Sequence, residues 1–172
     1  MQGYNTTVFT YGQTSSGKTH SLLGGSGERR GLTPRLLEDL FARSASCHDR
    51  SIDMYFSCLE IYQERLYDML CEDVQRNKSG TELRIRQHLN GDIWVEGMKE
   101  VAIPSMKEFN DHLQQALKRR TIASHAMNIE SSRSHLCCIV TVKQRLQGDE
   151  VRITSKLHLV DLAGSEMVLY VM

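Results

Sequence analysis

The chain has 172 residues, and its hydrophobic content of 40% and charged content of 24% are typical of one soluble globular domain rather than of a disordered segment. Its 21 basic and 21 acidic side chains give a formal charge of zero, so no overall positive field exists to hold nucleic acid or an anionic membrane. The longest apolar run, Leu136–Val142, is far shorter than the roughly 18 residues that a membrane helix requires. We therefore expect an intracellular chain that binds no nucleic acid and inserts into no membrane.

The cysteines and histidines do not follow the spacing of a metal site. The five cysteines include no CxxC pair, and the seven histidines include no HExxH pair. An odd number of cysteines also argues against a disulfide framework. We expect reduced, partly buried thiols and no transition metal.

The first half of the chain contains strand-like runs. Residues Thr6–Tyr11 are β-branched or aromatic and lead into a glycine, which predicts a strand that ends at a loop. Residues Ser51–Tyr62 form a second run of this kind. The apolar residues of Ile61–Leu70 fall near one helical face, which indicates a helical segment.

The second half predicts short strands, one helix and a hairpin. Residues Leu83–Val101 are expected to form short strands around a turn at Asn90-Gly91. Ser105 has capping-box spacing to Glu108 and opens a helix whose apolar stripe comprises Met106, Phe109, Leu113, Ala116 and Leu117. Two apolar-rich runs, 136–146 and 151–160, flank a polar turn and predict an antiparallel hairpin.

The first motif with chemical content follows the first strand. It matches GxxxxGK[ST], the pattern of a phosphate-binding loop between a strand and a helix, and we call it the P-loop: Gly12, Gln13, Thr14, Ser15, Ser16, Gly17, Lys18 and Thr19. The glycines let the backbone curve with its N–H groups around an anion, Lys18 reaches the β- and γ-phosphates, and the Thr19 hydroxyl suits Mg²⁺. The alternative is a flexible Gly/Ser loop with an incidental lysine.

A second motif lies at the end of the last predicted strand. Asp161 follows an apolar run, where the Mg²⁺-water ligand of a P-loop nucleotidase belongs. Strands that end in aspartate are common, so this signal alone is weak. With Gly164 it forms DxxG, in which the glycine amide can approach a γ-phosphate and swing away after hydrolysis.

A third cluster, Asn128–His135, precedes a predicted strand. It contains hydroxyls that suit Mg²⁺ coordination and water positioning, and Arg133, which suits a planar carboxylate or phosphate partner. Without the other two motifs, a serine-rich loop would be the simpler interpretation.

Together these motifs closely resemble the kinesin motor superfamily. The resembling segments are GYNTTVFTYGQTSSGKTH at 3–20, GLTPR at 31–35, EIYQERLYDML at 60–70, WVEG at 94–97, NIESSRSH at 128–135 (switch I) and DLAGSE at 161–166 (switch II). Thr6 stands where the family usually has glycine, and His125-Ala126 replaces a common Thr-Asn. Two other families share the P-loop and DxxG but fit this sequence less well. A myosin P-loop would read nearer GESGAGKT, and a small GTPase would carry the base-reading motif NKxD, which is absent here.

The resemblance implies roles for individual residues. Gln13 to His20 would cradle the phosphates of ATP, and Mg²⁺ would be held by Thr19, by Ser132 and, through water, by Asp161. Asn128 and Ser131 would face the phosphates and the attacking water. Gly164 would sense the γ-phosphate, while Arg133 would pair with Glu166 to latch the two switches. Such positioning and charge stabilisation are what phosphoryl transfer requires.

The resemblance also implies a fold and partners. We expect an α/β P-loop NTPase fold of the kinesin and myosin type, in which a mixed central sheet is flanked by helices. Residues 1–172 would form a partial motor domain, incomplete at both ends, of a cytoplasmic microtubule motor whose parent protein dimerises through regions outside this chain. Folding of the isolated chain would then be doubtful.

Two functions remain open from the sequence. One is an ATP-hydrolysing motor domain, for which Lys18, Ser132, Arg133, Gly164 and Glu166 are all present. The other is a truncated, non-catalytic nucleotide-binding or interaction module. Arg84, Arg86 and Lys99 are candidates for a minor microtubule contact, although a solvated strand face explains them as well.

Overall fold

The computed structural model describes residues 2–25, 27–71, 83–89, 91–127, 131–146 and 152–166. These residues form a mixed sheet in the order β1-β8-β7-β2-β3, with β6 added to β2, and a separate β4–β5 hairpin. The strands are β1 Thr6–Thr10, β2 Arg50–Tyr62, β3 Arg65–Asp68, β4 Arg84–Gln87, β5 Ile93–Glu96, β6 Val101–Ala102, β7 His135–Leu146 and β8 Arg152–Asp161. The helices are α1 Lys18–Leu22, α2 Leu32–Ala45 and α3 Met106–Met127, with 3₁₀ turns at η1 Gly27–Arg29 and η3 Ser131–Arg133.

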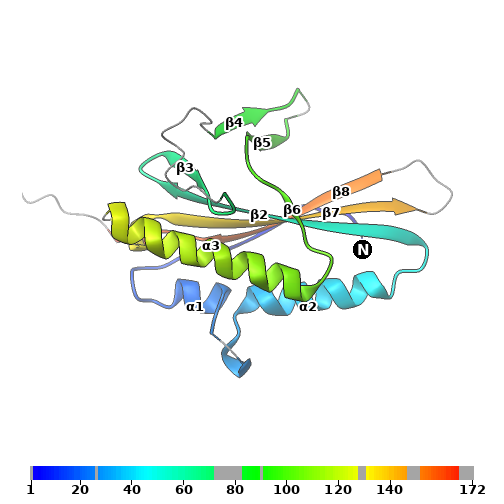
Figure 1. Cartoon of the computed structure of the whole chain (residues 1–172), viewed down its shortest axis with the longest axis horizontal. Coiled ribbons are helices and arrows are strands. Elements are labelled where there is room, and N and C mark those ends of the chain that lie inside the picture. The colour runs from blue at the N-terminus through cyan, green and yellow to red at the C-terminus, as the bar shows by residue number, and fades with distance from the viewer. Residues whose placement is uncertain are drawn as a thin grey trace, which may run out of the picture.

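The three helices lie on one face of the sheet, and the β4–β5 hairpin lies on the other side (Figure 1). The core fills the space between the helices and the long strands β2, β7 and β8. At its centre, Phe56 of β2 meets Phe109 of α3 edge to face, with ring centroids 5.2 Å apart and both rings fully buried. The predicted stripe of α3 therefore packs on the sheet, and the mixed sheet of the predicted fold class is confirmed.

The Ser105 side chain caps the start of α3, as its spacing to Glu108 suggested, through contacts that differ from the reciprocal pair of a capping box. The Lys107 amide donates a hydrogen bond of 3.2 Å to Ser105 Oγ, and Ser105 Oγ is hydrogen-bonded to the Glu108 carboxylate. This hydrogen bond from Ser105 holds the pKa of the Glu108 carboxyl below its ordinary value. Within the described residues, no helix combines the length and the apolar character needed to cross a membrane.

The helical segment expected over Ile61–Leu70 is wrong. Gln63 and Glu64 adopt left-handed backbone angles, with φ of 48° and 63°, and turn the chain tightly between β2 and β3. The turn pairs Tyr62 with Arg65 and starts an antiparallel ladder. Strand pairing satisfies the backbone of this segment and overrides its weak helical pattern.

The sequence interpretation also missed α2. Its apolar residues Leu36, Leu37, Leu40 and Phe41 follow helical spacing and pack on the core. Pro34 lies in the first turn, where a missing backbone N–H costs no helical hydrogen bond. The proline therefore marks the start of α2 and does not interrupt it.

The cysteines are free thiols. Cys58 of β2 and Cys138 of β7 are cross-strand partners, and their Sγ atoms lie 3.7 Å apart in the core. The Cys138 contact and burial raise the pKa of the Cys58 thiol, and burial raises that of Cys137 to about 12. The thiols of Cys58 and Cys137 are therefore protonated near neutral pH, and the buried pair of Cys58 and Cys138 contributes packing.

Strand pairing places the three motifs at one edge of the sheet. Strand β1 runs parallel to β8, so Thr10 lies beside Asp161 where both strands end. Strand β7 runs antiparallel to β8 and begins at that edge, with Leu136 opposite Asp161. The P-loop follows β1, switch II follows β8, and η3 of switch I precedes β7. Three segments far apart in the sequence therefore meet at this edge.

Candidate nucleotide-binding site

The P-loop curves through several left-handed backbone positions. The φ angles are 152° at Gly12, 64° at Ser15 and 90° at Gly17, and Gly17 precedes α1 directly. Alternation of right- and left-handed residues turns successive N–H groups to one side and creates a concave anion site. Ser15 is not a glycine, and a strained backbone at such a residue is typical of functional loops.

Lys18 spans the base of this loop. Its Nζ donates hydrogen bonds of 2.9 Å to the Gly12 carbonyl and 2.8 Å to the Gln13 carbonyl. The ammonium is therefore held at the P-loop. Because the stem of a lysine side chain is flexible, a phosphate oxygen can replace the two carbonyls as its partner. This position fits the role that the motif predicted for Lys18.

Asp161 lies directly behind the P-loop. Its carboxylate is buried and accepts hydrogen bonds from Thr19 Oγ1 at 2.6 Å and from Thr10 Oγ1 at 3.2 Å. A hydroxyl and a carboxylate in contact supply the hard oxygen ligands that Mg²⁺ prefers, directly or through water. The structure thus brings together two of the three residues that were predicted to hold Mg²⁺.

A buried ion pair supports Asp161 from the helix side. Arg120 Nε of α3 lies 2.9 Å from Glu60 Oε1 of β2, and its Nη1 lies 3.5 Å from Asp161 Oδ2. Ser134 Oγ completes the cluster, because it donates to Glu60 at 2.6 Å and accepts from Arg120 at 3.1 Å. We call Glu60, Arg120, Ser134 and Asp161 the buried network.

Sequence reasoning missed the role of the buried network, although two signals were present. Arg120 follows Ala116 by four residues and Leu113 by seven, so it falls on the apolar stripe of α3. Glu60 likewise interrupts an otherwise apolar stretch of β2. A charge at a core-facing position predicts a buried partner, because an unpaired buried charge is very costly.

Switch II contacts both other segments through its backbone. The Gly164 amide donates to the Ser132 carbonyl at 2.7 Å, and the Ser165 amide donates to the Gly12 carbonyl at 3.1 Å. The Ser132 contact lies between switch I and switch II, and the Gly12 contact lies between switch II and the P-loop. Both distances are within the normal range of backbone hydrogen bonds, so the three segments form one connected unit.

Glu166 lies over the P-loop. Its carboxylate accepts a hydrogen bond of 2.9 Å from the Thr14 amide and a second one from the Thr14 hydroxyl. The hydroxyl contact is the main cause that lowers the pKa of Glu166, and the Lys18 ammonium adds a smaller attraction. Glu166 is therefore ionised, and the structure shows that a P-loop amide donates a hydrogen bond to an anionic oxygen.

The remaining predicted residues are only partly described. Asn128 lies outside the described residues, as does the side chain of Ser131, whose backbone belongs to η3. Arg133 ends the same turn and is exposed, and His20 lies on α1 next to the P-loop. The latch between Arg133 and Glu166 stays a prediction.

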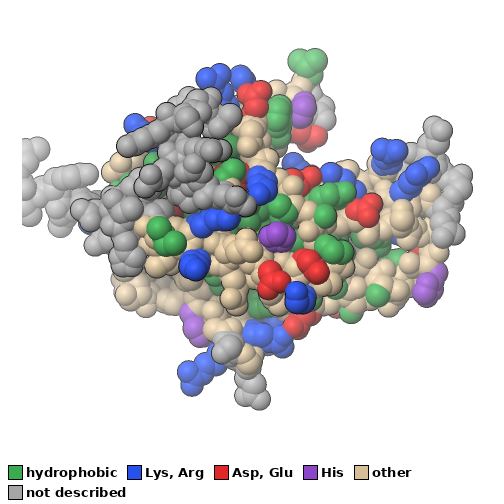
Figure 2. Space-filling view, viewed as in Figure 1, with side chains coloured by type: hydrophobic (Ala, Val, Ile, Leu, Met, Phe, Trp, Pro, Cys, Tyr) green, Lys and Arg blue, Asp and Glu red, His purple; other side chains and the backbone are tan. Residues whose placement is uncertain are grey.

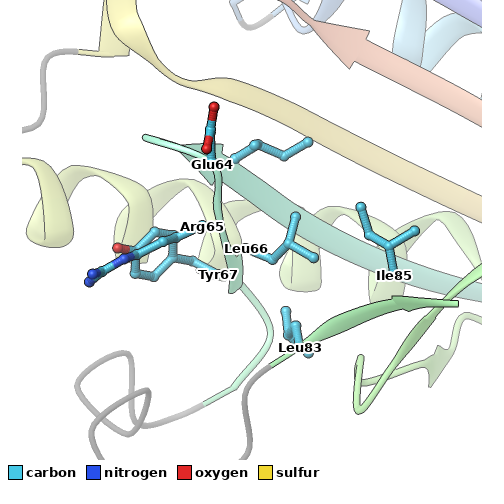
Figure 3. A pocket seen from close by; sticks show the side chains of 7 residues that line it. Glu64, Arg65, Leu66, Tyr67, Leu83 and Ile85 are labelled. Atoms are coloured by element: carbon cyan, nitrogen blue, oxygen red, sulfur yellow. The ribbon is translucent and has the colours of Figure 1, made fainter.

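A hollow of about 630 Å³ lies away from these loops, beside β3 and β4. Figure 3 shows Leu66 of β3 and Ile85 of β4 facing the same space, while Arg65 and Tyr67, which also line the hollow, extend from β3 in the direction opposite to Leu66. Its described lining is mostly aliphatic and aromatic, with Glu64 and Arg65 beside these side chains, and it includes neither a glycine-rich loop nor a Ser or Thr hydroxyl next to a carboxylate, the groups that would bind phosphate and Mg²⁺. The P-loop edge is therefore the candidate site.

Comparison with known proteins agrees with this geometry. A family model described as the kinesin motor domain matches residues 1–170. The chain belongs to the kinesin motor domain family. A solved structure of a fast kinesin superposes with a TM-score of 0.89 at 33% sequence identity, over 99% of this chain and 48% of that one. The kinesin fold predicted from the three motifs is therefore confirmed.

Curated kinesins show the same relationship at the sequence level. Kinesin-related protein 3 of Dictyostelium discoideum is 40% identical over 98% of this chain and 14% of its own length. Chromosome-associated kinesin KIF4 of Mus musculus is 38% identical over 96% of this chain and 14% of its own length. This kinesin chain thus spans about half of the solved kinesin chain and a small part of each curated relative.

Proposed function

We propose that this chain binds Mg-ATP at the edge formed by the P-loop, switch I and switch II, and hydrolyses it as part of a microtubule motor. One observation carries the proposal. The Gly164 and Ser165 amides connect switch II to switch I and to the P-loop, and all three segments carry the residue types that phosphoryl transfer needs.

The residues present fit a nucleotide with Mg²⁺. The curved P-loop and Lys18 would hold the phosphates, and residues 12–20 are the proposed contacts. Thr19 and Ser132 would ligate Mg²⁺ directly, and Asp161 would hold one of its waters. When bound, Mg²⁺ neutralises charge that develops on the transferred phosphoryl group.

The buried network would orient this metal site. Asp161 has a hydroxyl on each oxygen, and Arg120 stands behind it. A carboxylate held in this way cannot rotate away from Thr19 without breaking contacts in the protein interior. Preorganised ligands need no further ordering when the cation arrives, which favours binding in one geometry.

The switches would report the γ-phosphate. In this structure the Gly164 amide donates to the Ser132 carbonyl, so it must leave that partner to reach a phosphate. Asn128 and Ser131 would place the attacking water, and Arg133 and Glu166 would close over it. Loss of the γ-phosphate would release both switches and convert hydrolysis into a change of shape.

The β4–β5 hairpin is a candidate secondary contact with the microtubule. It carries Arg84 and Arg86, and Lys99 follows it in the chain. The fast kinesin whose structure resembles this chain is described as a protein that interacts with microtubules. By extension we place this chain on the cytoskeleton in the cytoplasm, in a parent protein that dimerises through other regions.

Steady-state ATP turnover tests the proposal. The purified chain is compared with Lys18→Ala, with and without microtubules, and Lys107→Ala on the exposed face of α3 serves as a matched lysine control. We expect turnover in the wild type and in the control and none above background in Lys18→Ala. Equal turnover in wild type and Lys18→Ala would exclude ATP hydrolysis at the P-loop of this chain. ATP binding without turnover would support the non-catalytic module instead.

A further inference from the structure

Three consecutive amides hold switch II in place, and each has a different acceptor. The Ala163 amide donates to His135 Nδ1 at 2.9 Å, the Gly164 amide to the Ser132 carbonyl and the Ser165 amide to the Gly12 carbonyl. Carbonyls are present whatever the side chain. Among these three acceptors, only His135 Nδ1 belongs to a side chain, so only this contact can be removed by a substitution.

His135 takes over where the strand ladder stops. It is the first residue of β7, and the pairing of β7 with β8 ends at Leu136 and Asp161. Beyond that point the chain leaves the sheet, and the Ala163 amide needs another acceptor because an unpaired, partly buried N–H is costly. The imidazole is half-buried and lies across from Ile61 of β2, so its position is fixed by the sheet.

The contact also specifies the state of the imidazole. Nδ1 can accept from an N–H only when it carries no proton, which places the ring proton on Nε2 in the neutral form. An asparagine at this position offers its Oδ1 atom close to where Nδ1 lies, whereas alanine offers no acceptor. The chain therefore allows a test that separates the acceptor from the bulk of the side chain.

We infer that His135 is a positioning residue that fixes switch II at Ala163, so that the next residue, Gly164, is the point that moves. Gly164 carries the amide that the proposed function assigns to the γ-phosphate, and this inference rests on that function. With Ala163 tethered, the Gly164 N–H exchanges its Ser132 partner for a phosphate by local rotation. Without the tether, the whole loop drifts, and the glycine amide is no longer presented at one distance.

Amide hydrogen exchange measured by NMR tests the contact directly. We compare wild type, His135→Asn and His135→Ala, with His112→Ala on α3 as the control for loss of an imidazole. Ala163 exchange should stay within about twofold of wild type in His135→Asn and in the control, and become roughly five- to tenfold faster in His135→Ala. Equal exchange in His135→Asn and His135→Ala, whether fast or slow, would overturn the inference.

The tautomer can be read from the wild-type protein without any substitution. Nitrogen-15 spectra of the imidazole should show the proton of His135 on Nε2 and a coupling from Nδ1 to the Ala163 amide. A proton on Nδ1 would overturn the assignment. This measurement keeps the inference testable even if His135→Ala fails to fold.

Nucleotide selectivity tests whether His135 positions the Gly164 amide for the γ-phosphate. The measurement compares affinities for a non-hydrolysable Mg-ATP analogue and for Mg-ADP. In His135→Ala the preference for the triphosphate should fall severalfold while the affinity for ADP is unchanged. In His135→Asn the preference should stay as in the wild type. If all variants keep the wild-type preference, His135 does not position Gly164. A wild type that binds neither nucleotide would overturn the proposed function itself, and with it this positioning role, whereas the exchange result would still decide the contact.

Discussion

Two arginine–glutamate pairs with nearly the same geometry lie in very different parts of this molecule. In the buried network, Arg120 lies 2.9 Å from Glu60, and their side chains are 7% and 1% exposed. On the β4–β5 hairpin, Arg86 lies 2.8 Å from Glu96, with exposures of 48% and 46%. The difference in surroundings determines what each pair contributes to the protein.

The hairpin pair is solvated and replaceable. Water and salt screen its attraction, so pairs of this kind contribute about 0–1 kcal/mol. Figure 2 shows hydrophobic side chains (green) and charges on this exposed part of the surface, where Ile85, Leu89 and Ile93 are largely in solvent. The buried pair instead holds α3, β2 and the end of β8 in one arrangement.

The largest expected effect separates the two pairs by stability. Arg120→Met removes the guanidinium but keeps an apolar stem, and it leaves Glu60 charged without its partner in the core. We expect a loss of about 3–5 kcal/mol in the free energy of unfolding. Urea unfolding of Arg120→Met and of the matched Arg86→Met, expected to lose about 0–1 kcal/mol, makes the comparison. Equal losses would mean that burial does not distinguish the pairs.

Two glycines make a second comparison between the core and the hairpin. A Cβ atom on Gly31 would lie 2.5 Å from the Leu23 carbonyl carbon and 2.6 Å from the Gly24 nitrogen, where the chain passes from α1 to α2. These neighbours are backbone atoms and cannot rotate away, so Gly31→Ala should cost about 2–3 kcal/mol. Gly91 has open space but a φ of 91°, so Gly91→Ala should cost about 1 kcal/mol. Thermal unfolding ranks them, and the reverse order would contradict this account.

A single hydroxyl tests how strongly Asp161 depends on its neighbours. Thr10→Val keeps the shape of the side chain but removes the donor to Asp161, so we expect a loss of about 1 kcal/mol in the free energy of unfolding. Thr121→Val on the exposed face of α3 removes a hydroxyl that donates to the Leu117 carbonyl, and it should change stability by less than about 0.5 kcal/mol. No difference between these variants in urea unfolding would mean that Thr10 does not support the network.

The smallest expected effect is a pH dependence from β8. Burial, and then the nearby Lys156 ammonium, lower the pKa of His158. The unfolded chain therefore takes up this proton first as the pH falls. The stabilising contribution of neutral His158 is present above the unfolded pKa of about 6.5 and is lost as the pH falls from there toward the lower folded pKa.

Substitution checks the sign of this dependence. His158→Gln should flatten the stability profile below about pH 6.5, and Lys156→Gln should flatten it in part because one of the causes is removed. Urea unfolding at a series of pH values measures both. A steeper profile in either variant would contradict the assigned direction.

The sequence predicted the parts of the fold that its patterns encode directly. The strand before the P-loop, the α3 stripe with its cap at Ser105 and the β7–β8 hairpin all follow from periodicity and turn chemistry, and the structure confirms them. The segment after Ile61 was interpreted wrongly because its turn uses Gln63 and Glu64 in left-handed conformations, for which these residues give no signal.

Several residues of the candidate site could be located from the sequence, but the contacts between them could not. The P-loop, Asp161 and Gly164 are recognisable by spacing. The bonds that join them run from the Gly164 and Ser165 amides to backbone carbonyls, and backbone groups leave no mark in a sequence. Arg120 and Glu60 were the exceptions, because each places a charge among apolar residues, and such a charge could have been noticed in the sequence.

Nucleotide affinity is the most direct test of the central claim, that the three loops form one site for a nucleoside triphosphate. Titration of the chain with a fluorescent, non-hydrolysable Mg-ATP analogue should show saturable binding that weakens when Mg²⁺ is chelated and is lost in Lys18→Ala but not in Lys107→Ala. Binding that is the same in wild type and Lys18→Ala, or independent of Mg²⁺, would contradict the account.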